Sequence, residues 1–189
     1  MKNIVFSLFA ASALVLVPAC ELVRITTERQ ISVSQEGSPA PYTKKYGFRW
    51  DTNIISWTYE EGAEPGEFRD RETRHVLSYI ESVTNVTFVE VEREAMITYS
   101  YPILPADRHA QAYPPSDRNP RSGDVEINSA SFTKDLFARI CCHETLHALG
   151  LPHVDDYRSI MNEAVAYLGY GIELTPGDIA EVNKRYTIN

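Results

Sequence analysis

The chain has 189 residues, of which 43% are hydrophobic and 23% are charged, and its formal net charge is −8. This balance is typical of a globular protein and argues against a disordered or membrane-embedded chain. The negative charge gives no electrostatic reason to bind nucleic acid or anionic lipid, so we expect no nucleic-acid partner.

Residues 1–19 have the pattern of a signal peptide. A positive start at Lys2 precedes an apolar run over residues 4–17, which is too short to span a bilayer comfortably. The run ends in Val17-Pro18-Ala19-Cys20, and a small residue followed by cysteine resembles the lipobox of bacterial lipoproteins, although proline is unusual there. We therefore predict export and a lipidated Cys20 that attaches the protein to a membrane of the cell envelope. Ordinary cleavage nearby, which would give a secreted protein, is the alternative.

Residues 20–44 are predicted to be a tether, because 35–41 is rich in turn-forming residues and lacks apolar periodicity. Residues 45–189 are predicted to form one α+β domain. Apolar periodicity predicts strands at 54–59, 86–91, 96–101 and 125–128 and helices at 67–83, 133–149 and 176–185. Residues 102–122 contain five prolines and are predicted to be a long loop. In the last helix, Thr175 is the expected N-cap and Pro176 begins the first turn.

Cys141 and Cys142 are neighbours on the second predicted helix. Adjacent helical residues point about 100° apart, so these two side chains cannot easily form a disulfide. We expect two reduced and largely buried thiols.

The same helix carries two histidines one turn apart. His143 and His147 share a face with Leu136 and Ile140, and the simplest interpretation is that they continue a core stripe. That interpretation leaves unexplained the glutamate directly after the first histidine and a third histidine beyond the helix. Histidines at i and i+4 can instead share one zinc ion, at about 2.0–2.1 Å from each ring.

The residues around this pair complete a catalytic pattern. Glu144 lies beside the metal position, where a carboxylate can take a proton from a zinc-activated water. Gly150 permits a left-handed turn that ends the helix, and Pro152 discourages its continuation, so the chain returns His153 as a third ligand. Three protein ligands leave a fourth position open, which is typical of catalytic rather than structural zinc sites.

The run His143 to His153 reads HExxHxxGxxH and resembles the metzincin zinc peptidases. Ser159-Ile160-Met161 resembles their methionine turn, with Met161 packed beneath the zinc, and its distance from His153 resembles that in the matrixins, the matrix-metalloproteinase-like family. Residues 112–115, 123–125 and 174–179 resemble further matrixin segments. The resemblance implies a metzincin fold, in which a twisted mixed sheet accompanies an active-site helix, a methionine turn and a C-terminal helix, and a bacterial secreted or lipoprotein type.

The chain departs from the family pattern at several places. Val154 stands where matrixins usually have serine, and no tyrosine follows two residues after Met161, which argues against the astacin-like and serralysin-like branches. Gln111 and Glu126 stand where vertebrate matrixins bind a structural zinc through histidines, so we expect no second zinc, and His109 nearby is expected to be a plain loop histidine. Residues 21–44 contain no cysteine that could cap the metal as a cysteine switch.

We therefore predict a monomeric zinc metalloendopeptidase with one catalytic zinc on His143, His147 and His153, Glu144 as general base, and a protein or peptide substrate. An edge strand at 125–128 is expected to bind the substrate in extended form. The resemblance to matrixins implies that Tyr167, Leu168 and Tyr170 shape the primed-side pocket. Two alternatives stay open, namely a lipid-anchored binding domain with a vestigial zinc site and a zinc hydrolase of a non-protein amide. Calcium is a second candidate ion, although acidic loop residues are usually only solvated; its candidate donors are Asp117, Asp124, Asp155 and Asp156.

Overall fold

The computed structural model describes residues 49–129, 133–164 and 171–187. Its elements are β1 (Ile54–Tyr59), α1 (Gly66–Val83), β2 (Thr87–Glu90), β3 (Ile97–Ser100), β4 (Ala110–Ala112), β5 (Asp124–Ile127), α2 (Lys134–Ala148) and α3 (Pro176–Arg185). The predicted signal peptide, the tether, Cys20 and the three predicted primed-side residues lie outside the described residues.

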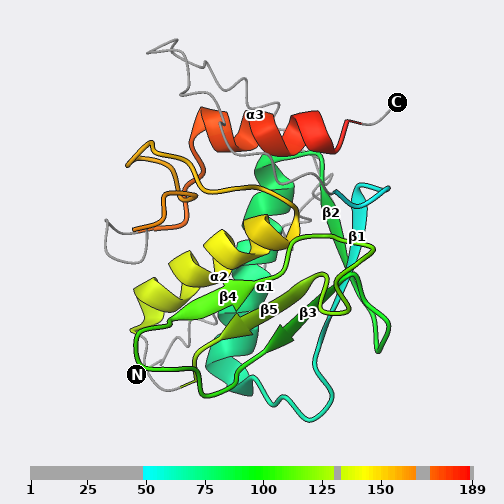
Figure 1. Cartoon of the computed structure of the whole chain (residues 1–189), viewed down its shortest axis with the longest axis vertical. Helices are drawn as coiled ribbons and strands as arrows, with labels where there is room; N and C mark the ends of the chain where they lie inside the picture. The colour runs from blue at the N-terminus through cyan, green and yellow to red at the C-terminus, as the bar shows by residue number, and fades with distance from the viewer. Residues whose placement is uncertain (1–48, 130–132, 165–170, 188–189) are drawn as a thin grey trace, which may run out of the picture. The chain divides into compact units, whose positions relative to one another are not determined.

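The strands form one mixed sheet in the order β2-β1-β3-β5-β4 (Figure 1). β1 pairs in parallel with β2 and β3, β3 pairs in parallel with β5, and β4 runs antiparallel to β5. Alternate residues of the three central strands are buried, which gives the sheet one apolar face. These residues are Ile55 and Trp57 in β1, Ile97 and Tyr99 in β3, and Val125 and Ile127 in β5.

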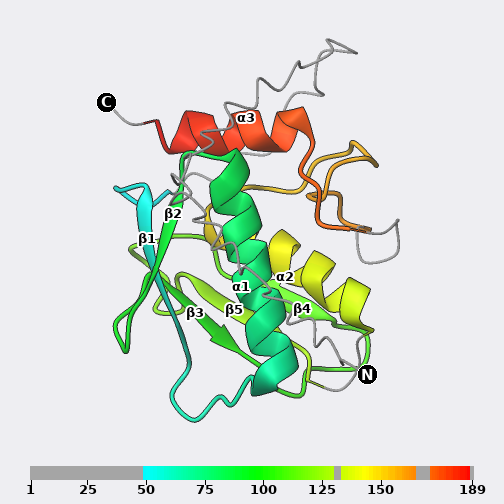
Figure 2. The same ribbon diagram turned by 180° about the vertical axis from the view of Figure 1, so that it is seen from behind.

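Helices α1 and α2 cover this apolar face side by side, as Figures 1 and 2 show from opposite directions. The Tyr99 hydroxyl lies 2.8 Å from the Thr145 hydroxyl of α2, and the Tyr101 hydroxyl lies 3.3 Å from the Thr73 hydroxyl of α1. Because residues 99 and 101 point to the same side of a strand, the two helices must lie on the same face of the sheet.

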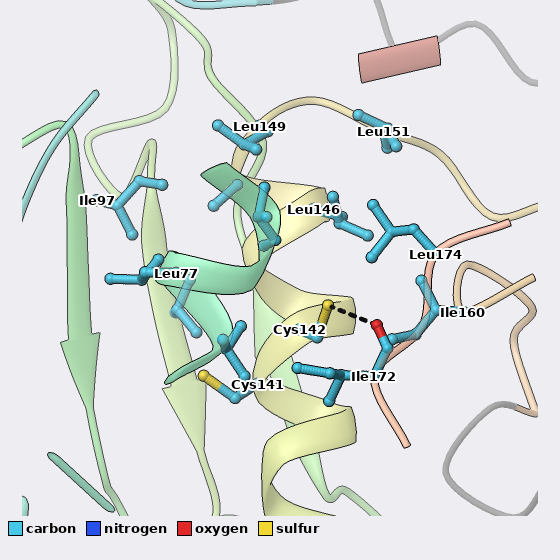
Figure 3. Packing of buried hydrophobic residues seen from close by; sticks show 14 of the residues in the cluster. Leu77, Ile97, Cys141, Cys142, Leu146, Leu149, Leu151, Ile160, Ile172 and Leu174 are labelled. Atoms are coloured by element: carbon cyan, nitrogen blue, oxygen red, sulfur yellow. Dashed lines mark hydrogen bonds between the residues drawn. The ribbon is translucent and has the colours of Figure 1, made fainter. Parts of the chain in front are cut away.

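Helix α2 is buried on more than one side, since Ile160, Ile172 and Leu174 pack against it on the side away from α1. Figure 3 shows Cys142 and Leu146 pointing toward Ile172 and Leu174, and the Cys142 sulfur lies 3.9 Å from the Ile172 carbonyl oxygen. Both cysteines are free and fully buried, which confirms the prediction made for them. Burial raises the pKa of the Cys141 thiol to about 12, so this thiol is unreactive at neutral pH.

The α+β class, the mixed sheet and the order of elements are confirmed, and the bounds of the predicted elements differ from the observed ones by at most one residue at either end. The predicted edge strand was wrong. The strand at 124–127 is β5, which lies between β3 and β4, and the edge belongs to β4, a strand inside the segment predicted to be a loop. Among the helices of the described ranges, none has the length and apolar character that crossing a bilayer requires.

Candidate metal centre and catalytic site

The structure brings together the three histidines that the sequence singled out. His143 and His147 project from one face of α2, and His153 approaches from the segment that follows the helix. The Nε2 atom of His147 lies 3.0 Å from that of His143 and 3.0 Å from that of His153, and the third pair is 3.2 Å apart. Within the described residues, this is the one group of three side chains placed to hold a metal ion.

The opposite nitrogen of two of these rings is fixed by the backbone. Nδ1 of His143 lies 2.7 Å from the Ile160 carbonyl oxygen, and Nδ1 of His147 lies 2.7 Å from that of Leu151. A carbonyl oxygen only accepts, so in each neutral ring Nδ1 carries the hydrogen and Nε2 presents a lone pair. Such lone pairs at 3.0 Å repel one another, and a cation between them replaces the repulsion by bonding.

These donors fit a zinc ion. Because the three nitrogens are 3.0–3.2 Å apart, a single point can lie at the usual Zn–N distance of about 2.0–2.1 Å from all of them. In the metal-free protein, burial lowers the pKa of His143 to about 4. Burial, followed by the neighbouring His143 and His153, lowers the pKa of His147 to about 3. Both rings are therefore neutral at pH 7, which is the protonation state that binds metal.

Glu144 lies next to this cluster and is buried, with 8% of its surface exposed. Burial raises the pKa of its carboxyl group to about 8 in the metal-free protein, and no hydrogen bond or opposite charge among the described residues offsets this effect. A buried carboxylate without such a partner destabilises a fold by several kcal/mol when it ionises. The residue therefore has no evident structural role, and perturbed carboxyls of this kind are concentrated at catalytic sites.

Replacing Glu144 with glutamine is expected to stabilise the metal-free protein at pH 8 but not at pH 4. Between the unfolded pKa of 4.5 and the folded pKa of about 8, the folded wild type retains a proton that the unfolded chain has released. Wild-type stability therefore falls as the pH rises through this interval, whereas glutamine does not titrate. The gain should reach roughly 3–5 kcal/mol at pH 8, measured by denaturant unfolding in the presence of a chelator. A difference between the two proteins that does not change with pH would contradict this account.

A Schellman motif at the end of α2 delivers the third histidine. Gly150 has a φ of 90°, its N–H donates to the His147 carbonyl at 2.8 Å, and the Leu151 N–H donates to the Leu146 carbonyl at 2.9 Å. This pair of bonds and the left-handed glycine define the motif, which reverses the chain after the helix. The predicted role of Gly150 is thus confirmed, and His153 follows two residues after the second of these bonds.

The predicted methionine turn is a buried turn tied to the last helix. Met161 and Ile160 are fully buried, the Met161 N–H donates to the Ser159 hydroxyl at 2.9 Å, and that hydroxyl donates to the Asp178 carboxylate at 2.6 Å. Asp178 also closes a capping box with Thr175 at the start of α3. The same turn supplies the Ile160 carbonyl that orients His143, so a buried carboxylate in α3 supports the histidine cluster. Sequence reasoning missed this role of Asp178, although the pattern Thr175-x-x-Asp178 is a recognisable capping box.

Replacing Asp178 with alanine is expected to destabilise the protein by about 2–4 kcal/mol. The change removes a helix cap and leaves the buried Ser159 hydroxyl without its acceptor, and each loss costs on the order of 1–2 kcal/mol. Denaturant unfolding measures the effect, with Asp155→Ala as the control because Asp155 is an exposed carboxylate in the segment after α2 that contains Ser159. The two variants should differ clearly, and equal effects would show that the buried carboxylate contributes no more than a surface one.

Gln111 and Glu126, the two positions at which the sequence resemblance predicted no second zinc, face each other as register partners of β4 and β5. Their side chains are hydrogen bonded, and Arg121 forms an ion pair with Glu126 and another with Asp124 at 3.1 Å. The Arg121 guanidinium also lies 4.2 Å from the centre of the Tyr113 ring. A polar cluster thus connects β4 and β5 with the loop between them at this place. Of the four candidate calcium ligands, Asp124 forms an ion pair with Arg121 and Asp156 forms one with Arg158. These two carboxylates already have cationic partners, and calcium binding stays a prediction.

The five-stranded mixed sheet, the helix carrying two of the histidines, the turn delivering the third and the methionine turn define a metzincin catalytic domain. The family model for matrixins, a peptidase family, matches residues 49–187, and the chain belongs to the matrixin family. A comparison with curated proteins found no match. Membership of this family implies a metalloprotease, and the histidine cluster is compatible with a zinc site.

Proposed function

We propose that the protein is a zinc-dependent endopeptidase in which His143, His147 and His153 hold one zinc ion and Glu144 is the general base. The observation that carries this proposal is the convergence of three Nε2 atoms within 3.2 Å, next to a buried carboxyl group that no partner stabilises. A closed structural site would use a fourth protein ligand, and three ligands leave room for a reacting molecule.

Zinc, when bound, acts as a Lewis acid that lowers the pKa of water and polarises the carbonyl of the scissile bond. Glu144 then takes the proton of the attacking water and later donates it to the leaving amine. A base is most effective when its pKa lies near the working pH, and burial moves Glu144 in that direction. The carbonyls of Ile160 and Leu151 accept from Nδ1 and so keep the rings of His143 and His147 in the tautomer whose Nε2 lone pair can bind a metal ion.

The proposed substrate is an extended peptide that adds to the free edge of β4. This strand pairs with β5 alone among the described strands and lies beside α2 (Figure 1). Backbone groups at a free strand edge bind a peptide through main-chain hydrogen bonds, largely independently of its sequence. We place the substrate here rather than on residues 125–128, because β5 is already paired on both sides.

For the N-terminal region we propose a signal peptide at 1–19, a lipidated Cys20 and a tether at 20–44. The support is the apolar run of residues 4–17 followed by Ala19-Cys20. Globomycin-sensitive processing and palmitate labelling of the wild type, compared with Cys20→Ala, test this proposal. Labelling that persists in the variant would exclude Cys20 as the lipid attachment site.

The experiment that tests the proposed activity is a digest of a peptide library with the purified protein, with and without a zinc chelator. We expect cleavage at internal bonds that chelation abolishes and added zinc restores. Zinc binding without cleavage would favour a binding domain, and hydrolysis confined to a non-peptide amide would favour a different hydrolase. The cleavage pattern reports the primed-side preference at the same time.

A further inference from the structure

The end of helix α2 has more backbone carbonyls than the helix and the turn after it can satisfy with their own N–H groups. The carbonyls of Thr145, Leu146 and His147 accept from the N–H groups of Leu149, Leu151 and Gly150, respectively. The next two carbonyls, those of Ala148 and Leu149, cannot be reached by the helix itself. Both residues are fully buried, so solvent is a poor substitute for a partner.

Side chains from the two ends of the described domain bind these two carbonyls. The indole Nε1–H of Trp50 donates to the Ala148 carbonyl at 3.0 Å, and the hydroxyl of Tyr186 donates to the Leu149 carbonyl at 2.9 Å. The Trp50 backbone N–H in turn donates to the Tyr186 hydroxyl at 3.4 Å. Arg49 donates to the Arg185 carbonyl and so ties the same two segments together.

The Trp50 ring is held closely in this place. Gly123, directly before β5, has a φ of 86°, and a Cβ atom there would lie 3.0 Å from the ring of Trp50 and 1.8 Å from the Met96 carbonyl oxygen. Only glycine allows the backbone to approach the indole so closely. The indole therefore lies between the sheet and the end of α2 with little freedom to move.

The carbonyls that Trp50 and Tyr186 bind belong to the stretch that places two of the three histidines. Ala148 follows His147 directly, and the Leu151 carbonyl that orients the His147 ring lies two residues beyond Leu149. The chain then reaches His153 within two more residues. A shift of residues 148–149 would move this carbonyl and His153 together.

We propose that Trp50 and Tyr186 are positioning residues of the metal centre, which hold the end of α2 in the conformation where His147 and His153 converge before zinc binds. This inference rests on the proposed zinc site. It connects the three histidines with the first residues that the structure describes and with the residue that follows α3. Neither residue touches the metal or the substrate, and both act through the backbone of residues 148–151.

A purely structural role and a positioning role predict different results. If the two side chains only stabilise the fold, their removal weakens the metal-free and zinc-bound proteins equally, and the zinc dissociation constant does not change. If they position the ligands, the metal-free helix end relaxes when a hydrogen bond is lost, and zinc must restore its geometry at a cost in affinity. Outer partners of metal ligands typically change metal affinity by about 10–100-fold.

The experiment compares Trp50→Phe and Tyr186→Phe with wild type in the full chain. Each change keeps an aromatic ring and removes one hydrogen-bond donor. Tyr59→Phe is the matched control, because the Tyr59 hydroxyl donates to Asp70 of α1 at 3.0 Å, away from the end of α2. Zinc dissociation constants are measured by competition with a chromogenic chelator, and unfolding of the metal-free proteins is measured in parallel. The visible spectrum of the cobalt-substituted proteins reports the ligand geometry.

We expect each of the two variants to bind zinc about tenfold more weakly and to alter the cobalt spectrum, while Tyr59→Phe changes affinity by less than about twofold. Unchanged zinc affinity in both variants, with or without a loss of stability, overturns the inference. Wild type that binds zinc but cleaves no peptide overturns the proposed function and leaves the inference to be decided by the affinities. Wild type that binds no zinc overturns both.

Discussion

Replacing Glu144 with alanine is expected to lower kcat/KM by about 10²–10⁴-fold while zinc stays bound, since general-base catalysis contributes an acceleration of this size. The carboxylate is not one of the three converging nitrogen donors, so its removal leaves the ligand set complete. The helix should tolerate the change, because alanine has the highest helix propensity and the lost carboxyl group had no partner. The loss should therefore appear in kcat rather than in the metal content.

Zinc content by atomic emission and cleavage rates of a fluorogenic peptide measure the two properties separately. Glu67→Ala is the matched control, since Glu67 is an exposed carboxylate in the first turn of α1 and should leave both properties unchanged. If the Glu144 variant cleaves at the wild-type rate, Glu144 is not the base. If it loses zinc together with activity, its role is in metal binding.

The cluster of three histidines could be predicted from the sequence because its determinants are local. Histidines one turn apart on a helix necessarily share a face, and a glycine followed by proline dictates where the helix ends and how the chain turns. His143, His147 and His153 span eleven consecutive positions, so no long-range packing is needed to bring them near one another. The structure accordingly places these three side chains together as the spacing indicated.

The edge strand could not be predicted for the opposite reason. β4 has three residues, Ala110–Ala112, in a segment with five prolines, and it is too short for its alternation of polar and apolar side chains to indicate a strand. Its extended conformation depends on pairing with β5, which is a contact between strands and not a property of the local sequence. The sequence therefore predicts the edge at the longer β5, although β5 lies one strand further in.

The residues that hold the segments next to the histidines in place could not be predicted from the sequence either. Trp50 lies 98 positions from Ala148, Tyr186 lies 37 positions from Leu149, and Asp178 lies 19 positions from Ser159. An aromatic residue or a capping aspartate has an ordinary local explanation at each of these places. Only the three-dimensional arrangement shows that they satisfy backbone or hydroxyl groups next to the histidines.

Replacing His153 with alanine is expected to weaken zinc binding by more than about 100-fold and to abolish activity at ordinary zinc concentrations. Even outer partners of metal ligands change affinity by about 10–100-fold, and the loss of a direct ligand must exceed this effect. His153 is the most informative of the three histidines to remove, because it comes from the turn after α2 and its loss leaves the helix unchanged. The fold should survive, since His153 is only partly buried.

His75→Ala is the matched control, because the His75 side chain is 63% exposed on α1 and lies 3.8 Å from Glu72. Chelator competition should give wild-type zinc affinity for the control and a large loss for the His153 variant. Retained affinity in the His153 variant would mean that two histidines and another group form the site. Taken with the Glu144 variant, the pattern separates the two roles. Loss of zinc together with activity identifies a ligand, and loss of activity with zinc retained identifies the base.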